Sequence, residues 1–399
     1  MVRKDKKIHQ VVNNLFKPIP KFSTLFSNTF NFRSVTITIL LLVNIFVLAK
    51  LNFFVPLISG RTTLWDFDDY FRLVGDLFKG INPYEVSYMR TWGPPLVFIY
   101  YIPFHFFRLE TARSLTTLLN ISSGVTTSIL LSKNLFPKEK LLSFLILNFL
   151  YFSSFPTRFS LEMGQPNLFL GLAITGIIFS KRENIKAVLE ALIISLKTFY
   201  LMTLIPSIIK KRRLVFKTIL ILLLAIIIFS PILHVDINTL YITKTLPQLF
   251  SGKSFAEGID YYNQSVLSVL GRIGIKSATK GVYFIFVLLS SFAILMSQSF
   301  EIAVVLSVIT SIISWQHYFA VLFPIYIIVL SKCTKKLLPI AFWCFLFFFW
   351  WVEFPCLHSA AENTANGILA SHYFLSALFL CAFILKNKKT HLTNQALLK

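Results

Sequence analysis

Long apolar segments recur along almost the whole chain, and they constrain its fold more than any other feature. Several approach the roughly 20 residues that an α-helix needs to cross the hydrocarbon of a bilayer. Hydrophobic residues make up 55% of the 399 residues, and 43 residues are phenylalanine. The segments lack the regular polar face of a surface helix in a soluble protein. The sequence therefore predicts an all-α polytopic membrane protein with about twelve membrane segments.

The net charge of +22 is distributed in a way that excludes nucleic-acid binding as its explanation. Lysine and arginine gather in short clusters between apolar segments, which is where cytoplasmic loops carry them. The cysteines have no CxxC spacing, so the sequence predicts neither a zinc site nor a redox pair. They are Cys333, Cys344, Cys356 and Cys381. We expect no cofactor and no obligatory metal, because no His, Cys or carboxylate cluster has the spacing of metal ligands.

The basic clusters also predict how the chain is organised across a membrane. Residues 1–33 form a basic segment that we expect in the cytoplasm, and residues 34–385 form one transmembrane domain. Within that domain we expect a first outer loop at about 59–113 and a second large outer segment at about 234–280. Residues 386–399 form a cytoplasmic tail, so both termini are expected inside.

Two apolar segments do not fit a simple crossing. Gly93 to Phe107 is short and contains three prolines, and we expect it to lie in the interface or to re-enter. Ile185 to Ile209 stands between two basic clusters that should both be cytoplasmic. We therefore expect two short helices broken near Lys197. Broken helices are tolerated in membranes where they line a cavity.

An acidic stretch follows the first apolar segment, from Trp65 to Pro95, and carries Asp66, Asp68 and Asp69. Its first part has the spacing of an amphipathic helix. The apolar face consists of Phe67, Tyr70, Phe71, Val74, Leu77 and Phe78. We expect Asp66 at the N-cap and Gly80 just past the helix end. Such a helix beside a membrane span should lie flat in the interface.

Four blocks of residues form a pattern that spans most of the chain. The first block comprises Asp66-Phe67-x-x-Tyr70-Phe71, Gly80-x-Asn82-Pro83-Tyr84 and Pro94-Pro95-Leu96. The second is Gly164-Gln165-Pro166-Asn167, and the third is Leu196-Lys197 ahead of the basic cluster at 210–213. The fourth is Asn263-Gln264-Ser265, followed by Ser314-Trp315-x-His317. With these blocks in this order, the chain resembles glycosyltransferase family 87, a family of GT-C membrane glycosyltransferases.

The resemblance is not complete at two positions. Thr198 follows Lys197 where the family often has proline, and Gly93 stands where an aromatic residue often precedes the two prolines. The acidic stretch also holds two more aspartates than the single one that the resemblance leads us to expect.

The resemblance implies a GT-C fold with its catalytic aspartate in the first outer loop and interfacial helices around it. It implies transfer of a hexose, mannose by this resemblance, from a polyprenyl-phosphate sugar to a lipid or glycan acceptor, with inversion. The reaction would take place on the outer face of a bacterial inner (plasma) membrane, which the chain would cross many times. Single displacement needs one base for the acceptor hydroxyl. The leaving lipid phosphate is a stable anion, so no paired general acid is needed.

The resemblance points to Asp66 as the base, with Asp68 and Asp69 as alternates. Asp66 could instead serve only as a helix cap. The expected substrate-binding residues are Tyr70, Arg72, Asn82, Tyr84, Arg158, Gln165, Lys197, Asn263, Gln264 and His317.

Seven of these residues also have a structural interpretation. Lys197 could be an interfacial lysine that extends to the headgroups. Gln165 could serve helix packing, and Asn82 and Tyr84 could form a turn. The two arginines could contact lipid headgroups, and His317 could be a structural histidine.

A second class of function remains open from the sequence. A transporter or flippase for polyprenyl-linked glycans would share the apolar cavity and the cations but perform no chemistry. Its charges would follow a path through several spans, whereas the acidic residues here gather at one outer edge. That distribution favours transfer. A membrane-embedded acyltransferase is a third class, but the sequence lacks the His-Asp pair that such an enzyme would need.

Overall fold

The structure, a computed structural model, describes residues 30–50, 62–86, 93–251, 262–274, 279–350 and 364–397. The predicted basic segment up to residue 29, parts of both outer loops and Cys356 lie outside these ranges. Within them the regular structure is helical and no strand is present. One isolated β-bridge pairs Asn263 with Trp315. The predicted all-α class is therefore confirmed.

The helices of the first half of the chain are α3 (Phe30–Lys50), α5 (Trp65–Phe78), the 3-10 turn η1 (Pro95–Val97), α6 (Phe98–His105), α7 (Leu109–Leu135), α8 (Lys140–Ser153), α9 (Phe155–Met163), α10 (Asn167–Phe179) and α11 (Glu183–Leu196). Next come η2 (Thr198–Leu204), α12 (Ile205–Lys210), α13 (Arg212–Phe229), α14 (Val235–Leu240), the π-helical turn η3 (Tyr241–Thr245), α15 (Leu246–Ser251) and α16 (Val266–Arg272). The remaining helices are α17 (Thr279–Ser297), α18 (Phe300–Thr310), η5 (Gln316–Leu322), α19 (Phe323–Lys332), α20 (Leu338–Cys344), η6 (Phe345–Trp350), α21 (Thr364–Ala370) and α22 (His372–Leu397).

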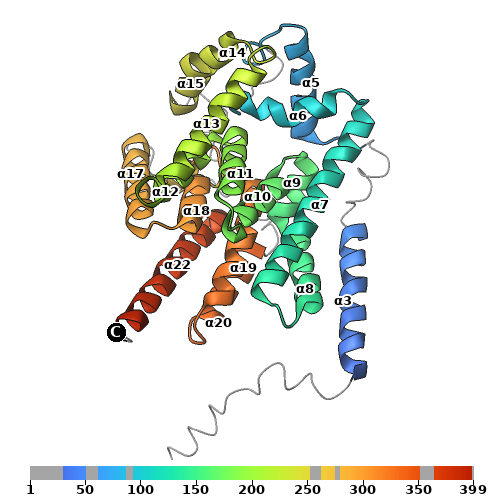
Figure 1. Ribbon diagram of the computed structural model, residues 1–399, viewed down its shortest axis with the longest axis vertical. Helices are drawn as coiled ribbons and strands as arrows, with labels where there is room; N and C mark the ends of the chain where they lie inside the picture. The colour runs from blue at the N-terminus through green and yellow to red at the C-terminus, as the bar shows by residue number, and fades with distance from the viewer. Residues whose placement is uncertain are drawn as a thin grey trace, which may run out of the picture.

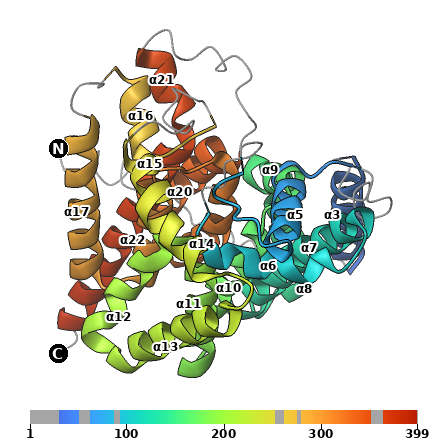
Figure 2. The ribbon, with the colours of Figure 1, turned by 90° about the horizontal axis from the view of Figure 1, so that it is seen from above.

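The helices form an elongated bundle with two distinct ends (Figure 1). Helices α5, α6, α14 and α15 lie at the upper end in that view, and α20 and the C-terminal end of α22 lie at the lower end. Seen from above, α5, α6, α7 and α8 gather on one side, and α17, α22 and α16 on the other (Figure 2). Helices α10 and α11 lie between these groups and contact each other directly.

The centre of the bundle is built from helices that are apolar on all sides. Residues 302–305 of α18 are at most 1% exposed, and residues 319–323 of η5 and α19 are fully buried. A helix without a polar face is typical of a buried position. These central helices support η2, α9 and α10, which carry polar side chains toward one another near the upper end.

The length of the helices bears on the predicted membrane segments. Among the described residues, α7 is the one helix that is both long and apolar enough to cross a bilayer by itself. The other apolar stretches of helix have 10–17 residues, and some consist of two elements joined end to end, as η5 and α19 are over Gln316–Lys332. Helix α6 has eight residues, about 12 Å at 1.5 Å per residue, far short of a bilayer core. That length suits the interfacial or re-entrant position expected for this segment.

Helix α5 corrects two expectations about the acidic stretch. The N-cap is Leu64, so Asp66 lies inside the first turn and does not cap the helix. The apolar face is also not free to rest on lipid, because Phe67, Val74 and Leu77 are buried against other helices, chiefly α6. Burial against protein removes more apolar surface from water than an interface would. The predicted end is confirmed by Gly80, whose φ of +76° is the left-handed conformation common after a helix.

Two further segments bear on the site. The segment 155–164 forms α9 and its cap, with Pro156 in the first turn and Gly164 at the C-cap. Proline fits the first turn because that position needs no backbone donor. The predicted break at Lys197 is present, since α11 ends at Leu196 and η2 begins at Thr198.

Candidate functional site

Asp66 and Lys197 are joined by a single side chain, the amide of Gln165. Gln165 Nε2 donates to Asp66 Oδ2 at 2.7 Å, and Lys197 Nζ donates to Gln165 Oε1 at 3.2 Å. A carboxylate only accepts hydrogen bonds and an ammonium only donates them. The Gln165 amide must therefore point its nitrogen toward Asp66 and its oxygen toward Lys197. Three residues from α5, the α9–α10 turn and the α11–η2 break thus form one polar group. We name Asp66, Gln165 and Lys197 the carboxylate–amide–lysine group.

Gln165 takes its position from the turn that closes α9. Gly164 caps the helix with φ +67°, and the Gln165 amide nitrogen donates to Ser160 O at 3.0 Å. Asn167 Nδ2 also donates to Ser160 Oγ at 3.1 Å. A Cβ on Gly164 would lie 2.5 Å from the Cβ of Phe67, which is next to Asp66 in the chain. Glycine here lets α5 approach α9 closely enough for Asp66 to reach Gln165.

We predict that Gly164→Ala destabilises the protein by about 1–3 kcal/mol, because the new methyl group must displace α5 and the backbone there is left-handed. Transfer activity should fall with it. The matched control is Gly271→Ala in α16, where an added Cβ meets nothing within 4 Å. Thermal unfolding of both variants in detergent checks this. Equal midpoints for the two variants would contradict the close approach.

Lys197 lies against an aromatic face. Its Nζ is 3.7 Å from the ring centroid of Tyr318, a geometry that stabilises a cation through the ring quadrupole. The neighbouring His317 is 2% exposed and packs edge-on against Phe159 and Tyr318. Neither ring nitrogen of His317 has a hydrogen-bond partner in the part of the chain that the structure describes. An imidazole left in this way beside the lysine is suited to bind a polar ligand atom.

Aromatic rings lie close to the carboxylate. Tyr70, one turn after Asp66 on α5, stacks on Tyr101 of α6 with centroids 4.5 Å apart and planes 3° from parallel. Phe67 meets Tyr101 and Phe104 on the same helix. These contacts hold α5 on α6 and fix the first turn that carries Asp66.

Asp68 faces away from Gln165 and forms a buried ion pair. Arg113 Nε donates to Asp68 Oδ1 at 2.8 Å, and Nη2 donates to Oδ2 at 2.5 Å. The Asp68 side chain is 5% exposed and that of Arg113 is 11% exposed. This bidentate geometry uses both carboxylate oxygens. The pair ties α5 to the start of α7 and occupies the carboxylate that was an alternate to Asp66.

We expect Asp68→Asn to lower the stability of the protein much more than the rate of transfer by the folded molecules. Removing the carboxylate breaks the bidentate pair with Arg113, and breaking a buried ion pair costs about 3–5 kcal/mol in comparable cases. The midpoint of unfolding should fall strongly, while the rate per folded molecule at reduced temperature stays within a few-fold of wild type. If Asp68→Asn were as stable as wild type but inactive, the base would have to be reassigned to Asp68.

Asp69, Arg72 and Arg158 are not part of the carboxylate–amide–lysine group and make other contacts. Asp69 is half-buried, and the exposed Arg72 is the cation that most favours its charged form. Burial nevertheless raises the pKa of Asp69. The guanidinium of Arg158 stands 5.7 Å over the ring of Phe155, and its Nε has no partner among the described residues.

Asn82 and Tyr84 shape the chain after α5. Asn82 Oδ1 accepts from the Tyr84 amide at 3.1 Å, and Tyr84 donates its hydroxyl to Gly93 O at 2.7 Å. Asn82 also lines a cavity of about 320 Å³ with His234 and Asp236 from the start of α14. The turn predicted here is present, and it borders a cavity that Asp66 does not line.

Asn263 and Gln264 are fully buried and hydrogen-bonded within the protein. Asn263 Oδ1 accepts from the amides of Ser265 and Ser314, and Gln264 Nε2 donates to Ala370 O at 2.7 Å. These bonds join the segment before α16 to the segment before η5 and to the last residue of α21. The two side chains hold these segments together, and contact between them and a substrate stays a prediction.

The environment of Asp66 favours its protonation more than water does. Burial raises the pKa of this carboxyl, and the nearby Asp69 adds to the rise. The hydrogen bond from Gln165 and the charge of Lys197 act in the opposite direction. A carboxyl with this balance is a better base than an exposed aspartate once it is ionised. Among the described residues, no group of three or more His, Cys, Asp or Glu is arranged to hold a metal ion.

Sequence reasoning missed two contact partners: Tyr318, which lies against Lys197, and Arg113, which pairs with Asp68. Tyr318 and Arg113 carried no recognisable signal in the sequence, because Lys197 and Asp68 reach them across long stretches of chain. Tyr318 follows the block that ends at His317, and this adjacency was the one available hint.

Comparison with known families identifies the family of the chain. A model described as Glycosyltransferase family 87 matches residues 92–330. The matched region contains Gln165, Lys197 and His317, and Asp66 precedes it. No curated protein matches the chain.

Proposed function

The chain belongs to glycosyltransferase family 87 and is a glycosyltransferase, and from this premise we propose that it takes a hexose from a polyprenyl-phosphate sugar. The acceptor would be a lipid or glycan hydroxyl, the sugar mannose, and the anomeric centre would be inverted. The observation that carries this proposal is the carboxylate–amide–lysine group, in which a candidate base and a candidate phosphate-binding cation are bridged by one amide. Membership of a transferase family makes the flippase alternative unnecessary.

In the proposed reaction Asp66 takes the proton of the acceptor hydroxyl while the oxygen of that hydroxyl attacks C1 of the donor sugar. The bond between C1 and the phosphate oxygen breaks, and the electron pair leaves with the lipid phosphate. Lys197 stabilises that phosphate by charge and hydrogen bonding. Gln165 sets the distance between the two groups. Single displacement on one face of the sugar inverts the configuration at C1.

We propose that His317, Tyr70 and Arg158 complete the substrate contacts. His317 offers two ring nitrogens without partners among the described residues, and Tyr70 stands on the same helix as the base. We assign Arg72, Asn82 and Tyr84 to contacts with the acceptor. Together with Gln165 and Lys197, these residues are the substrate-binding set that we retain.

We further propose that the chain is a multi-pass protein of a bacterial inner membrane, with about twelve membrane segments and Asp66 on the outer face. The clusters of lysine and arginine between the apolar segments support this orientation. The domain boundaries follow, with a cytoplasmic segment at 1–33, the transmembrane domain at 34–385 and a tail at 386–399.

The dependence of transfer on pH offers a specific check. Asp66 must be ionised to act as the base, so kcat/KM should fall as the pH drops through its pKa. Because burial raises that pKa, the inflection should lie above the value of about 3.9 for a free aspartate. Asp69→Asn should move the inflection down, since the charge of Asp69 raises the pKa of Asp66. An inflection at the ordinary value, unmoved in this variant, would contradict the assignment.

The direct test of the proposed function uses membranes that contain the wild-type chain. Radiolabelled polyprenyl-phosphate mannose and glucose are supplied in parallel, and the label is followed into lipid and glycan fractions. We expect transfer from the mannose donor, with the product linkage inverted relative to the donor. Label that remains in the donor with both sugars would overturn the proposal.

A further inference from the structure

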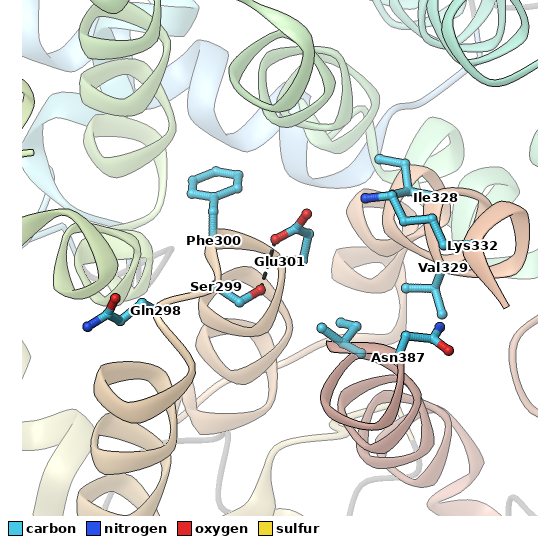
Figure 3. A pocket seen from close by; sticks show the side chains of 9 residues that line it. Gln298, Ser299, Phe300, Glu301, Ile328, Val329, Lys332 and Asn387 are labelled. Carbon is cyan, nitrogen blue, oxygen red and sulfur yellow. Dashed lines mark hydrogen bonds between the residues drawn. The ribbon is translucent and has the colours of Figure 1, made fainter. Parts of the chain in front are cut away.

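A second polar cavity lies far from Asp66, toward the lower end of the bundle. It has a volume of about 300 Å³ and is enclosed by the start of α18, the end of α19 and the last part of α22 (Figure 3). This volume is at the lower limit of the roughly 300–1,000 Å³ typical of small-molecule sites. Its walls combine apolar side chains such as Phe300 and Ile328 with charged and amide groups.

Opposite charges from two helices border the cavity. Glu301 lies in the first turn of α18 and Lys332 in the last turn of α19. No ion pair within 4.0 Å joins either of them to another group in the described ranges. Ser299 Oγ donates to Glu301 Oε2 at 2.8 Å and accepts from the Ile302 amide, so the carboxylate is held in place. The cavity thus keeps a cation and an anion apart, with space between them.

Asn387 of α22 adds an acceptor whose partner is missing. The residue is 8% exposed, and its Nδ2 donates to Cys333 Sγ at 3.6 Å. Its Oδ1 has no hydrogen-bond partner in the described part of the chain. Buried carbonyl oxygens in proteins almost always have a donor. Figure 3 shows Glu301, Lys332 and Asn387 on three different helices around the same space.

The position of the cavity indicates where its ligand comes from. Lys335 and Lys336 follow α19 directly, and Lys386 is next to Asn387. A concentration of lysines at one end of a membrane bundle is typical of the cytoplasmic side. The aliphatic wall formed by Ile328, Val329 and Ile384 would suit the acyl part of an amphiphile.

We propose that this cavity binds the phosphoethanolamine headgroup of a zwitterionic phospholipid from the cytoplasmic leaflet, with the phosphate on Lys332 and the ammonium on Glu301 and Asn387 Oδ1. Such a ligand supplies a donor to Asn387 Oδ1, a cation to Glu301 and an anion to Lys332. A simple anion would be repelled by Glu301, and a simple cation by Lys332. Phosphatidylglycerol satisfies Lys332 but brings no positive charge to Glu301. The site is separate from the reaction and does not depend on which sugar is transferred.

The test uses the full chain in nanodiscs that contain equal amounts of dioleoyl phosphatidylethanolamine and dioleoyl phosphatidylglycerol. Native mass spectrometry after release counts the lipids that stay bound. We expect phosphatidylethanolamine to be retained in preference, and Glu301→Gln to reduce its retention at least tenfold, as loss of a charge-assisted hydrogen bond implies. Lys332→Gln should reduce retention of both lipids. The control Lys336→Gln, an exposed lysine beyond the cavity, should leave both unchanged.

Equal retention of the two lipids by the wild type would overturn the proposal, and so would unchanged retention in both Glu301→Gln and Lys332→Gln. Lys332 is exposed, so its variant remains informative if the Glu301 variant does not fold. Soluble phosphoethanolamine at millimolar concentration is tested separately. Suppose that soluble phosphoethanolamine binds the wild type, binds Glu301→Gln more weakly, and the lipid is not retained. The natural ligand is then a soluble compound and not a phospholipid. A chain that retains the lipid but transfers no sugar would refute the proposed function and leave this site intact.

Discussion

Asp66→Asn is expected to slow sugar transfer by about a thousandfold, within the roughly 10²–10⁴-fold that general-base catalysis contributes. Asparagine has nearly the same shape, and its carbonyl oxygen can still accept the hydrogen bond that Gln165 Nε2 donates to Asp66 at 2.7 Å. The geometry around the site should therefore persist while the base is lost. Donor affinity should change by less than a few-fold. Rates of label transfer and equilibrium binding of the polyprenyl-phosphate sugar, measured on one preparation, separate the two effects.

The matched control for this experiment is Asp69→Asn, three residues further along the same helix. Asp69 is half-buried, like Asp66, but among the described residues no hydrogen bond or ion pair joins it to Gln165 or Lys197. Its plateau rate should stay within a few-fold of wild type. If Asp69→Asn abolished transfer and Asp66→Asn did not, the base would be Asp69. Gln165 would then not bridge the base and Lys197.

Lys197→Met is expected to reduce kcat/KM on the order of 100-fold, the effect of removing one preorganised donor from a developing anion. Methionine keeps an unbranched apolar stem against Tyr318 but removes the charge and the bond to Gln165. The acid limb of the pH profile should also move to higher pH, because the charge of Lys197 lowers the pKa of Asp66. Steady-state rates across pH, with donor concentration varied, measure both changes.

Two further variants test whether the charge itself is required. Lys133→Met, at the exposed end of α7, removes one lysine far from the site in sequence and should leave the rate unchanged. Lys197→Arg keeps the charge and should recover part of the loss. Full activity in Lys197→Met would show that the leaving phosphate is stabilised elsewhere, and Arg158 would be the next residue to substitute.

Local sequence was a good guide to the helices around the site. Apolar periodicity located α5 to within a few residues, and Gly80 marked its end because only glycine takes a positive φ at little cost. The charge clusters on both sides of Lys197 predicted the break between α11 and η2. The predicted N-cap, Asp66, was wrong, because the N-cap of α5 is Leu64, two residues earlier. Helix ends are the least determined feature of such a pattern, because several residues can begin the same turn.

The expected substrate residues divided according to their long-range contacts. Gln165 and Lys197 come together with Asp66, while Asn263 and Gln264 are used inside the protein. All of them were expected to bind substrate from the same pattern of blocks. The four sequence blocks indicate which residues matter. They do not distinguish a residue that contacts substrate from one that holds the fold together.

The sequence by itself determined that this chain would form apolar helices with an acidic helix among them, since hydrophobic content and spacing act over a few residues. Helix geometry, at 100° per residue, also placed Asp66 and Asp69 on one side and Asp68 nearly opposite. Only the tertiary structure decided which carboxylate meets which cation. Lys197 acts on Asp66 through Gln165, 99 residues from Asp66, and Arg113 is 45 residues from Asp68. Contacts over such separations depend on the packing of whole helices, which no local pattern in the chain records.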